Sequence, residues 1–339
     1  MDNNFYLDRE KSEVRRNFSR LFLALTVYLV IAYAVQIVCE VILLLFFYDQ
    51  AEAIVTSPYF LMGMNVFSMY IIAFPVFLIM TKGEKVRREK RKEKPVDLLI
   101  LLLISWGAMY IGNLVGTLLN LGIGNFFGIE VNNDLNDVIN STPVWLLVLV
   151  VVIIGPIIEE LMFRKVMIDR LSGYGASVAI WVSAVAFGLF HGNFYQFFYA
   201  ALIGLVLGYI YTKTGRIEYT IGIHMIINLF GSVVALYATE WATKYEEMTL
   251  LLVEGGEVAM GEYVLYSVLS NSYVSLSLGA SVIGIAAGIH YIRKKKFELE
   301  ENKLAPLSKG EVIKAGLCSA GAISFMVVSA ILIGFSLFT

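Results

Sequence analysis

Residues Val144–Ile158 read VWLLVLVVVIIGPII, and Glu159 and Glu160 follow directly. The run is apolar throughout, as expected for a helix inside a bilayer. An ionisable residue at membrane depth costs roughly 2.5–3.5 kcal/mol on insertion scales. Two adjacent carboxylates at the end of such a run are therefore expected to be partnered, solvated by an internal cavity, or used in chemistry.

The composition of the whole chain agrees with a membrane protein. Of its 339 residues, 58% are hydrophobic and 16% are charged, whereas soluble domains average about 45–50% and about 25%. The formal net charge of −2 gives no field that favours nucleic acid. No targeting segment is recognisable, so we expect a multi-pass protein of a bacterial cell membrane, with an all-α transmembrane bundle.

A helix that crosses the hydrocarbon core needs about 20 apolar residues, and the chain offers about nine such segments. The fifth is short, and only Gly192 and Asn193 join it to the sixth, so one of the two is expected to be broken or re-entrant. The candidates are Leu21–Phe47, Tyr59–Thr81, Leu98–Ile123, Val144–Phe163, Ser177–His191, Phe194–Thr212, Ile217–Ala238, Tyr263–Ile292 and Val312–Phe338.

The distribution of basic residues predicts the orientation of these spans, because cytoplasmic loops carry an excess of Lys and Arg. Nine spans with a cytoplasmic N-terminus place every basic cluster inside and the C-terminus outside. The basic clusters are the N-terminal segment, Lys82–Lys94, Arg164–Arg170, Lys213 with Arg216, and Arg293–Lys296. The segments between them, Tyr48–Pro58, Asn125–Pro143 and Glu240–Glu262, are acidic or neutral.

We divide the chain into N-terminal helices (1–143), a core that holds the acidic doublet (144–238), and a C-terminal part (239–339) that starts with an extracytoplasmic loop. Cys39 and Cys318 are interpreted as small buried hydrophobic residues without a disulfide. Three GxxxG pairs are expected to let helices approach closely: Gly112/Gly116, Gly204/Gly208 and Gly284/Gly288.

Polar residues in the central segments form a candidate site. Glu160 and Arg164 can meet one helical turn apart, and so can the faces of His224 and Asn228. Glu159 is displaced by about 100° from Glu160 and is expected to face a different neighbour. Two further features are read as supporting: Pro156 can kink the helix beside the carboxylates, and His191 ends the fifth segment. His290, the third histidine, is assigned to the membrane interface.

These residue types suit a hydrolase. A desolvated carboxylate is a useful base, a histidine can orient water, and N–H donors on one helix face can stabilise an oxyanion. No serine or cysteine stands in a nucleophile context. The structural interpretation remains open here, because a Glu–Arg pair can be a simple ion pair and an intramembrane histidine can simply join helices.

The pattern Glu159-Glu160-x-x-x-Arg164, Phe187-x-x-x-His191 and His224-x-x-x-Asn228 resembles the CPBP family. This family comprises the type II (Rce1-like) CAAX prenyl proteases and bacteriocin-processing enzymes, also called the ABI family. The resemblance covers roughly residues 144–237. It departs from many bacterial members at Lys165, where they carry glycine.

The resemblance implies an intramembrane glutamate-dependent endopeptidase without a cofactor. Glu159 would activate the water, assisted by His191, with Phe187 packed behind the histidine. His224 and Asn228 would form the oxyanion hole. Glu160 and Arg164 would hold the site together, and Glu160 would be able to share the role of base.

Two alternatives stay open. Glu159, His191 and His224 offer the two-histidine, one-carboxylate set of zinc hydrolases, and a non-catalytic immunity or transport protein could use the same fold. The expected partners are the lipid bilayer and a peptide or protein substrate: a prenylated CAAX tail, a bacteriocin leader, an exported peptide or a membrane anchor. At 1.5 Å per residue, His224 lies about 10 Å and His191 about 20 Å from the cytoplasmic edge, a difference that tilted or broken helices would have to remove.

Overall fold

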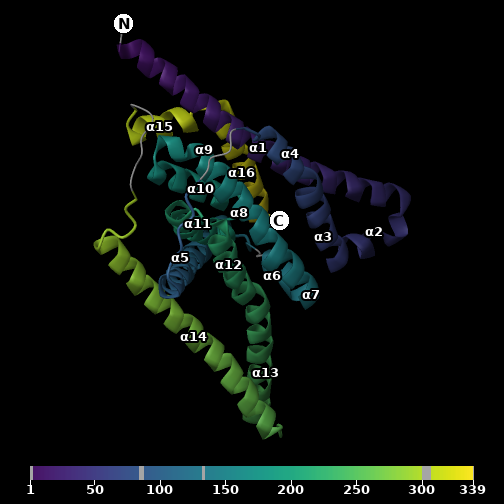
Figure 1. Cartoon of the computed structure of the whole chain (residues 1–339). Helices are drawn as coiled ribbons and strands as arrows, with labels where there is room; N and C mark the ends of the chain where they lie inside the picture. Colours follow the sequence, from purple (N-terminus) through teal and green to yellow (C-terminus); the bar gives the residue numbers. More distant parts are fainter. Residues whose placement is uncertain (1–2, 84–87, 132–133, 300–306, 339) are drawn as a thin grey trace.

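The computed structural model describes residues 3–83, 88–131, 134–299 and 307–338, and every regular element in these ranges is helical (Figure 1). This confirms the all-α prediction. The elements in chain order are α1 (Asn3–Phe46), α2 (Tyr48–Val55), α3 (Pro58–Asn65), η1 (Val66–Ala73), α4 (Phe74–Met80), α5 (Pro95–Phe127), α6 (Asp134–Ser141), α7 (Val144–Leu147), η2 (Val148–Ile154), α8 (Gly155–Glu160), η3 (Leu161–Ile168), α9 (Asp169–Leu171), η4 (Ser172–Tyr174), α10 (Ala176–Phe190), α11 (Phe194–Thr214), α12 (Ile217–Asn228), η5 (Leu229–Val234), α13 (Ala235–Val253), α14 (Met260–Arg293), α15 (Lys309–Leu317) and α16 (Ala320–Phe338).

Within the described ranges, 8 helices are long and apolar enough to cross a membrane. The fifth predicted span is not among these helices. It corresponds to α10, which has 15 residues and falls short of a full crossing. It ends at Phe190, and α11 begins at Phe194 after a tight turn in which Gly192 has φ +67°. The protein is thus a multi-pass membrane protein in which the short fifth segment pairs closely with the sixth.

Two boundaries differ from prediction. The seventh span does not end near Ala238 but continues as α13 to Val253, so most of the predicted loop Glu240–Glu262 is helical. Figure 1 shows α13 and α14 as a long pair that projects from the bundle. The end of the apolar run does not end the helix. The residues that follow it in α13 include Glu, Ala, Lys and Leu, which all favour helix.

The last predicted span, Val312–Phe338, is divided into α15 and α16. The chain turns at Cys318 and Ser319, and the Ser319 carbonyl accepts a hydrogen bond from the N–H of Ile323 in the next helix. α15 carries Lys309, Glu311 and Lys314, whose charges favour water over lipid. Only α16 is therefore left to cross the membrane.

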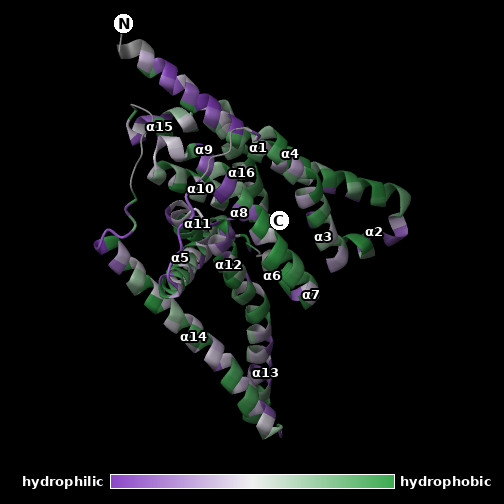
Figure 2. Ribbon diagram, in the orientation of Figure 1, coloured by the Kyte–Doolittle hydropathy of each residue, from purple (hydrophilic) through white to green (hydrophobic). Residues whose placement is uncertain are grey.

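The predicted cytoplasmic clusters meet at one end of the bundle. Lys213 pairs with Glu93 at 3.0 Å, and the Tyr209 hydroxyl donates to the Lys296 carbonyl at 2.8 Å. Figure 2 shows hydrophilic colour gathered at the start of α1, at the same end. Parts of three predicted regions lie outside the described residues: 84–87 of the basic loop, 132–133 of an outer loop, and the final residue.

Glycines set the helix spacing around α5. A Cβ on Gly112 would meet the backbone of Tyr199 in α11, and one on Gly116 would lie 2.6 Å from the Phe194 carbonyl oxygen. On the other face of α5, a Cβ on Gly284 of α14 would meet the backbone of Leu103. Two of the predicted GxxxG pairs thus provide the close contacts that hold α11 and α14 against α5.

The main core lies between α1, η3, α10 and α16. It contains seven buried phenylalanines: Phe18, Phe22, Phe77, Phe163, Phe187, Phe190 and Phe325. The cysteine prediction was half wrong, because neither thiol is in this core: Cys39 is half-buried and Cys318 is exposed, since both lie at helix surfaces. Both are free, as predicted.

Candidate functional site

The acidic doublet lies on a helix with an irregular backbone. The π-helical segment η2 runs to Ile154, α8 spans Gly155–Glu160, and a second π-helical segment, η3, begins at Leu161. Pro156 lacks the N–H that a regular helix would use, and it lies just after the change from the π-helical to the α-helical pattern. Short π-helical stretches often accompany functional sites.

The Glu160 side chain is fully buried, and its carboxylate contacts Arg164 and His224. One carboxylate oxygen lies 3.1 Å from Nε of Arg164, and the other lies 3.0 Å from Nδ1 of His224. Arg164 is also fully buried, and its guanidinium lies 4.6 Å from the centre of the Phe187 ring. Burial of both charges indicates that this pair is a fixed support, not a solvent-exposed group.

Glu159 is the accessible member of the doublet, with 21% of its side chain exposed. Its Oε2 lies 3.6 Å from Nε2 of His224. Glu160 thus pairs with Arg164, and Glu159 faces a different neighbour, His224, as expected. The sharing of His224 by both glutamates was not foreseen; it is possible because an imidazole carries nitrogens on two sides. His224 contacts both carboxylates at once.

His191 follows the end of α10, and its ring is oriented by the backbone. Its Nδ1 lies 2.8 Å from the carbonyl oxygen of Phe187, so Nδ1 carries the proton and donates. In the neutral ring this leaves Nε2 as the acceptor. The ring meets Phe187 edge-on, with 4.9 Å between centroids, and it is half-buried.

Phe187 lies between the two histidines. Its ring centroid lies 4.9 Å from that of His191 and 5.8 Å from that of His224. Both histidines thus lie against one phenylalanine ring, although counting along the helices separates them by about 10 Å in depth. The two ends of α10 are packed against α1. Just before α10 begins, the Tyr174 hydroxyl accepts a hydrogen bond from Asn17 of α1. Asn17 lies 11 residues before Tyr28, which is about 16 Å along α1. The Tyr28 ring in turn contacts Phe190 at the end of α10, with 5.2 Å between centroids.

Asn228 lies one turn after His224 on α12, as predicted from the spacing. Its Nδ2 donates to the carbonyl oxygen of Val151 in η2 at 2.9 Å. An amide nitrogen carries two hydrogens, so this bond engages one of them. The contact fixes the Asn228 side chain against the helix that carries the glutamates.

Three tyrosines near Glu159 were not foreseen. Its charge acts on the phenols of Tyr28, Tyr70 and Tyr199, which come from α1, η1 and α11. The Tyr70 hydroxyl also lies 3.4 Å from the position of a Cβ on Gly155, one turn before Glu159. Nothing in the sequence distinguishes these tyrosines among the 19 of the chain, since their proximity depends entirely on helix packing.

In the described ranges, no group of three or more His, Cys, Asp or Glu side chains is arranged to hold a metal ion. The set predicted for the zinc alternative is thus not gathered around one point. His224 contacts both carboxylates, whereas the orienting contact of His191 is with the backbone of Phe187.

Comparison with known proteins bears on the predicted family. Residues 141–230 match the family described as type II CAAX prenyl endopeptidase Rce1-like, and all six predicted site residues lie in this range. Over 121 residues the chain is 29% identical to "Putative membrane peptidase YdiL" of Bacillus subtilis (strain 168), a match that covers 35% of this chain and 49% of that relative. The chain therefore matches about half the length of this relative, and no solved structure matches it. Both matches support the predicted resemblance of the region 141–230 to the CPBP family.

Proposed function

We propose that the protein is an intramembrane endopeptidase in which Glu159 is the general base. The observation that carries this proposal is the contrast within the doublet. Glu160 is sealed and neutralised by Arg164, whereas Glu159 is partly exposed and lies 3.6 Å from His224. A base must reach its water, and only Glu159 meets that condition. The family match and the peptidase name of the relative support the reaction class.

In the proposed mechanism, Glu159 takes a proton from a water molecule as the water attacks the carbonyl carbon of a peptide bond. His191 assists through Nε2, which can accept a hydrogen bond from that water. Its Nδ1–H bond to the Phe187 carbonyl oxygen holds the ring in this tautomer. The proton on Glu159 then passes to the leaving amine as the bond between carbon and nitrogen breaks.

The developing oxyanion needs hydrogen-bond donors. Asn228 has one amide hydrogen beyond the one bonded to Val151, and we assign it to the oxyanion. We assign Nε2 of His224 as the second donor. Because Nδ1 already donates to the Glu160 carboxylate, this role requires the His224 ring to carry a proton on both nitrogens. Arg164 and Glu160 act through His224, as positioning residues.

The proposed substrate is a peptide or protein segment that reaches below the cytoplasmic membrane surface. Glu159 precedes Arg170, at the cytoplasmic end of the same helix, by 11 residues, which is about 16 Å. A segment must therefore enter the bilayer to that depth, which favours a lipid-modified tail, a leader peptide or a membrane anchor. No nucleic acid and no cofactor are proposed as partners.

The test uses the purified full-length protein in liposomes with a library of quenched fluorescent peptides, with and without a lipid tail. Glu159→Gln and His191→Ala should each reduce cleavage by about 10²–10⁴-fold, the usual contribution of general acid–base catalysis. Glu240→Gln, which removes an exposed carboxylate on α13, is the matched control and should cleave normally. Normal turnover by a folded Glu159→Gln protein would refute the mechanism. Stoichiometric zinc that is lost together with activity would favour the metal alternative.

A further inference from the structure

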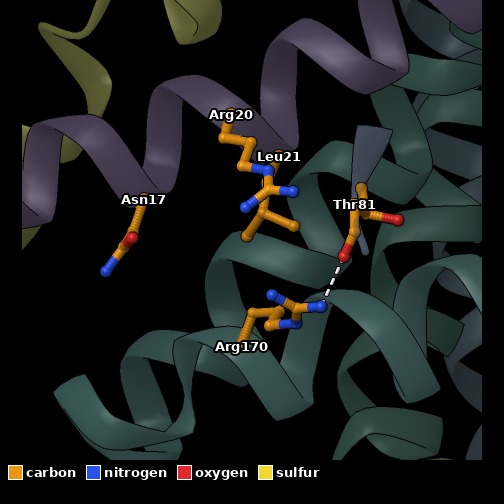
Figure 3. Close-up of a pocket in the computed structure, with 5 residues that line it drawn as sticks. All are labelled: Asn17, Arg20, Leu21, Thr81 and Arg170. Carbon is orange, nitrogen blue, oxygen red and sulfur yellow. Dashed lines mark hydrogen bonds between the residues drawn. The ribbon is translucent and has the colours of Figure 1, made fainter. Parts of the chain in front are cut away.

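A polar cavity lies at the cytoplasmic end of the bundle, away from the proposed catalytic site. It has a volume of about 150 Å³ and is lined by Asn17, Arg20, Leu21, Thr81 and Arg170 (Figure 3). One water takes roughly 30 Å³ in the liquid, so the cavity has room for a group of several heavy atoms. Its walls come from α1, the end of α4, and α9.

Both arginines of the cavity are fixed by the same helix end. Nε and Nη2 of Arg20 donate to the carbonyl oxygens of Met80 and Lys82, at 2.7 Å and 2.5 Å. Arg170 donates to the carbonyl oxygen of Thr81. Figure 3 shows Arg20 and Arg170 reaching toward each other from opposite helices, with Arg170 bonded to Thr81. These bonds use only some of the N–H donors of two guanidiniums, so the pair is pre-positioned with donors to spare.

The positive charge of the pair is not neutralised within the described part of the chain. Neither guanidinium has an ion-pair partner there, and the two like charges act on each other. The charge of Asp169 acts favourably on Arg170, but its carboxylate is shared with Arg88, Lys165 and Tyr211. A pocket with two converging guanidiniums that lack an ion pair of their own favours an anion.

We propose that this cavity binds the phosphate group of an anionic phospholipid of the cytoplasmic leaflet. Guanidinium groups match phosphate oxygens in geometry and charge. Basic pockets between transmembrane helices at the cytoplasmic side are suited to lipid headgroups. Leu23, one turn after Arg20 on α1, is 42% exposed and provides apolar surface for the acyl chains. Free phosphate shares the headgroup chemistry but gains nothing from that surface.

The lipid site is distinct from the catalytic one. Arg20 precedes Tyr28, which is within reach of the Glu159 charge, by eight residues, about 12 Å along α1. Neither arginine contacts a residue to which we assign a catalytic role. The inference therefore does not depend on the proposed function, and its test requires no peptidase substrate.

The experiment measures lipid retention by native mass spectrometry on the full-length protein, delipidated in nonionic detergent. Phosphatidylglycerol, phosphatidylcholine and inorganic phosphate are titrated separately. The wild type should retain phosphatidylglycerol in preference to the other two. Arg20→Gln with Arg170→Gln should weaken phosphatidylglycerol binding by at least about tenfold, because charge-assisted hydrogen bonds are lost. Arg9→Gln with Arg15→Gln removes the same charge from positions of α1 that do not line the cavity and should leave binding unchanged.

Equal weakening by the two double variants would overturn the proposal, since general surface charge would then explain the retention. Inorganic phosphate bound as tightly as the lipid would overturn the lipid assignment. If the glutamine variant does not fold, Arg20→Lys with Arg170→Lys keeps the charge and loses the planar fork. It should still retain less phosphatidylglycerol than Arg9→Lys with Arg15→Lys, and equal retention would contradict the proposal.

Discussion

One continuous helical segment carries two successive ion pairs with the same spacing and different surroundings. Glu160 and Arg164 are four residues apart, with 3.1 Å between charged atoms, and neither side chain is exposed. Lys165 and Asp169 are also four residues apart, at 2.9 Å, but 46% of the lysine side chain is exposed. The first pair is part of the candidate site, and the second lies farther along the segment, toward the end of the bundle where the basic clusters meet.

The difference between the pairs is in what surrounds them. Both Nη atoms of Arg164 are buried without a hydrogen-bond acceptor, and the face of Phe187 is their main compensation. Asp169, in contrast, accepts hydrogen bonds from Arg88, Lys165 and Tyr211. A buried ion pair is weak evidence for stability, because desolvation can exceed the attraction. The Glu160–Arg164 pair is better explained by its position against His224 than by any gain in stability.

The largest effect is expected when the buried pair is broken on one side. Arg164→Met leaves Glu160 charged and buried without its counter-ion, which costs about 3–5 kcal/mol. The free energy of unfolding in mixed micelles should fall by that amount, and cleavage should be lost with it. A stability change below about 1 kcal/mol would mean that His224 or water compensates the Glu160 charge without Arg164.

The double variant Glu160→Gln with Arg164→Met distinguishes the role of the pair in positioning His224 from its contribution to stability. Because it removes both charges, most of the lost stability should return, as for other buried pairs replaced by neutral residues. Cleavage should stay low, since His224 loses the carboxylate that holds its Nδ1. Full activity in this variant would contradict the positioning role.

A smaller effect is expected at the pair of Lys165 and Asp169. Asp169→Asn keeps the shape of the side chain but removes the charge that Arg88, Lys165 and Tyr211 share. The expected loss is about 1.5–3 kcal/mol, the usual contribution of hydrogen bonds to a charged group. Thermal unfolding in detergent measures it. Glu240→Gln, from the exposed i,i+4 pair with Lys244, is the control and should change little. Equal effects of the two would show that the Asp169 network adds nothing.

The same contrast explains what the sequence could foresee. Contacts within one helix, such as Glu160 with Arg164, follow from spacing alone and are present in the structure. The contact of His224 with both glutamates depends on how α12 is rotated against α8, which spacing does not determine. For the same reason the tyrosines around Glu159 were missed, since they come from three separate helices.

Span positions were predictable because lipid requires long apolar runs, but helix ends were not. α13 continues beyond the apolar run to Val253, and the turn at Cys318 interrupts a segment that hydropathy alone treats as one. In both places, hydropathy reports where lipid can lie, whereas the backbone follows local hydrogen bonding. Hydropathy also identified α10 as a candidate span although it is too short to cross alone.

The smallest effect is expected at Lys165, the position where the chain departs from the glycine of many family members. Its ammonium lies 2.9 Å from Asp169 and 3.3 Å from the Tyr211 hydroxyl, but nearly half of its side chain is exposed. Lys165→Gln should therefore cost at most about 1 kcal/mol, because Arg88 and Tyr211 still hold Asp169. Thermal unfolding of Lys165→Gln beside Asp169→Asn gives the comparison. A loss equal to that of Asp169→Asn would mean that Lys165, and not Arg88, is the main counter-ion, and that solvent screens this pair far less than its exposure implies.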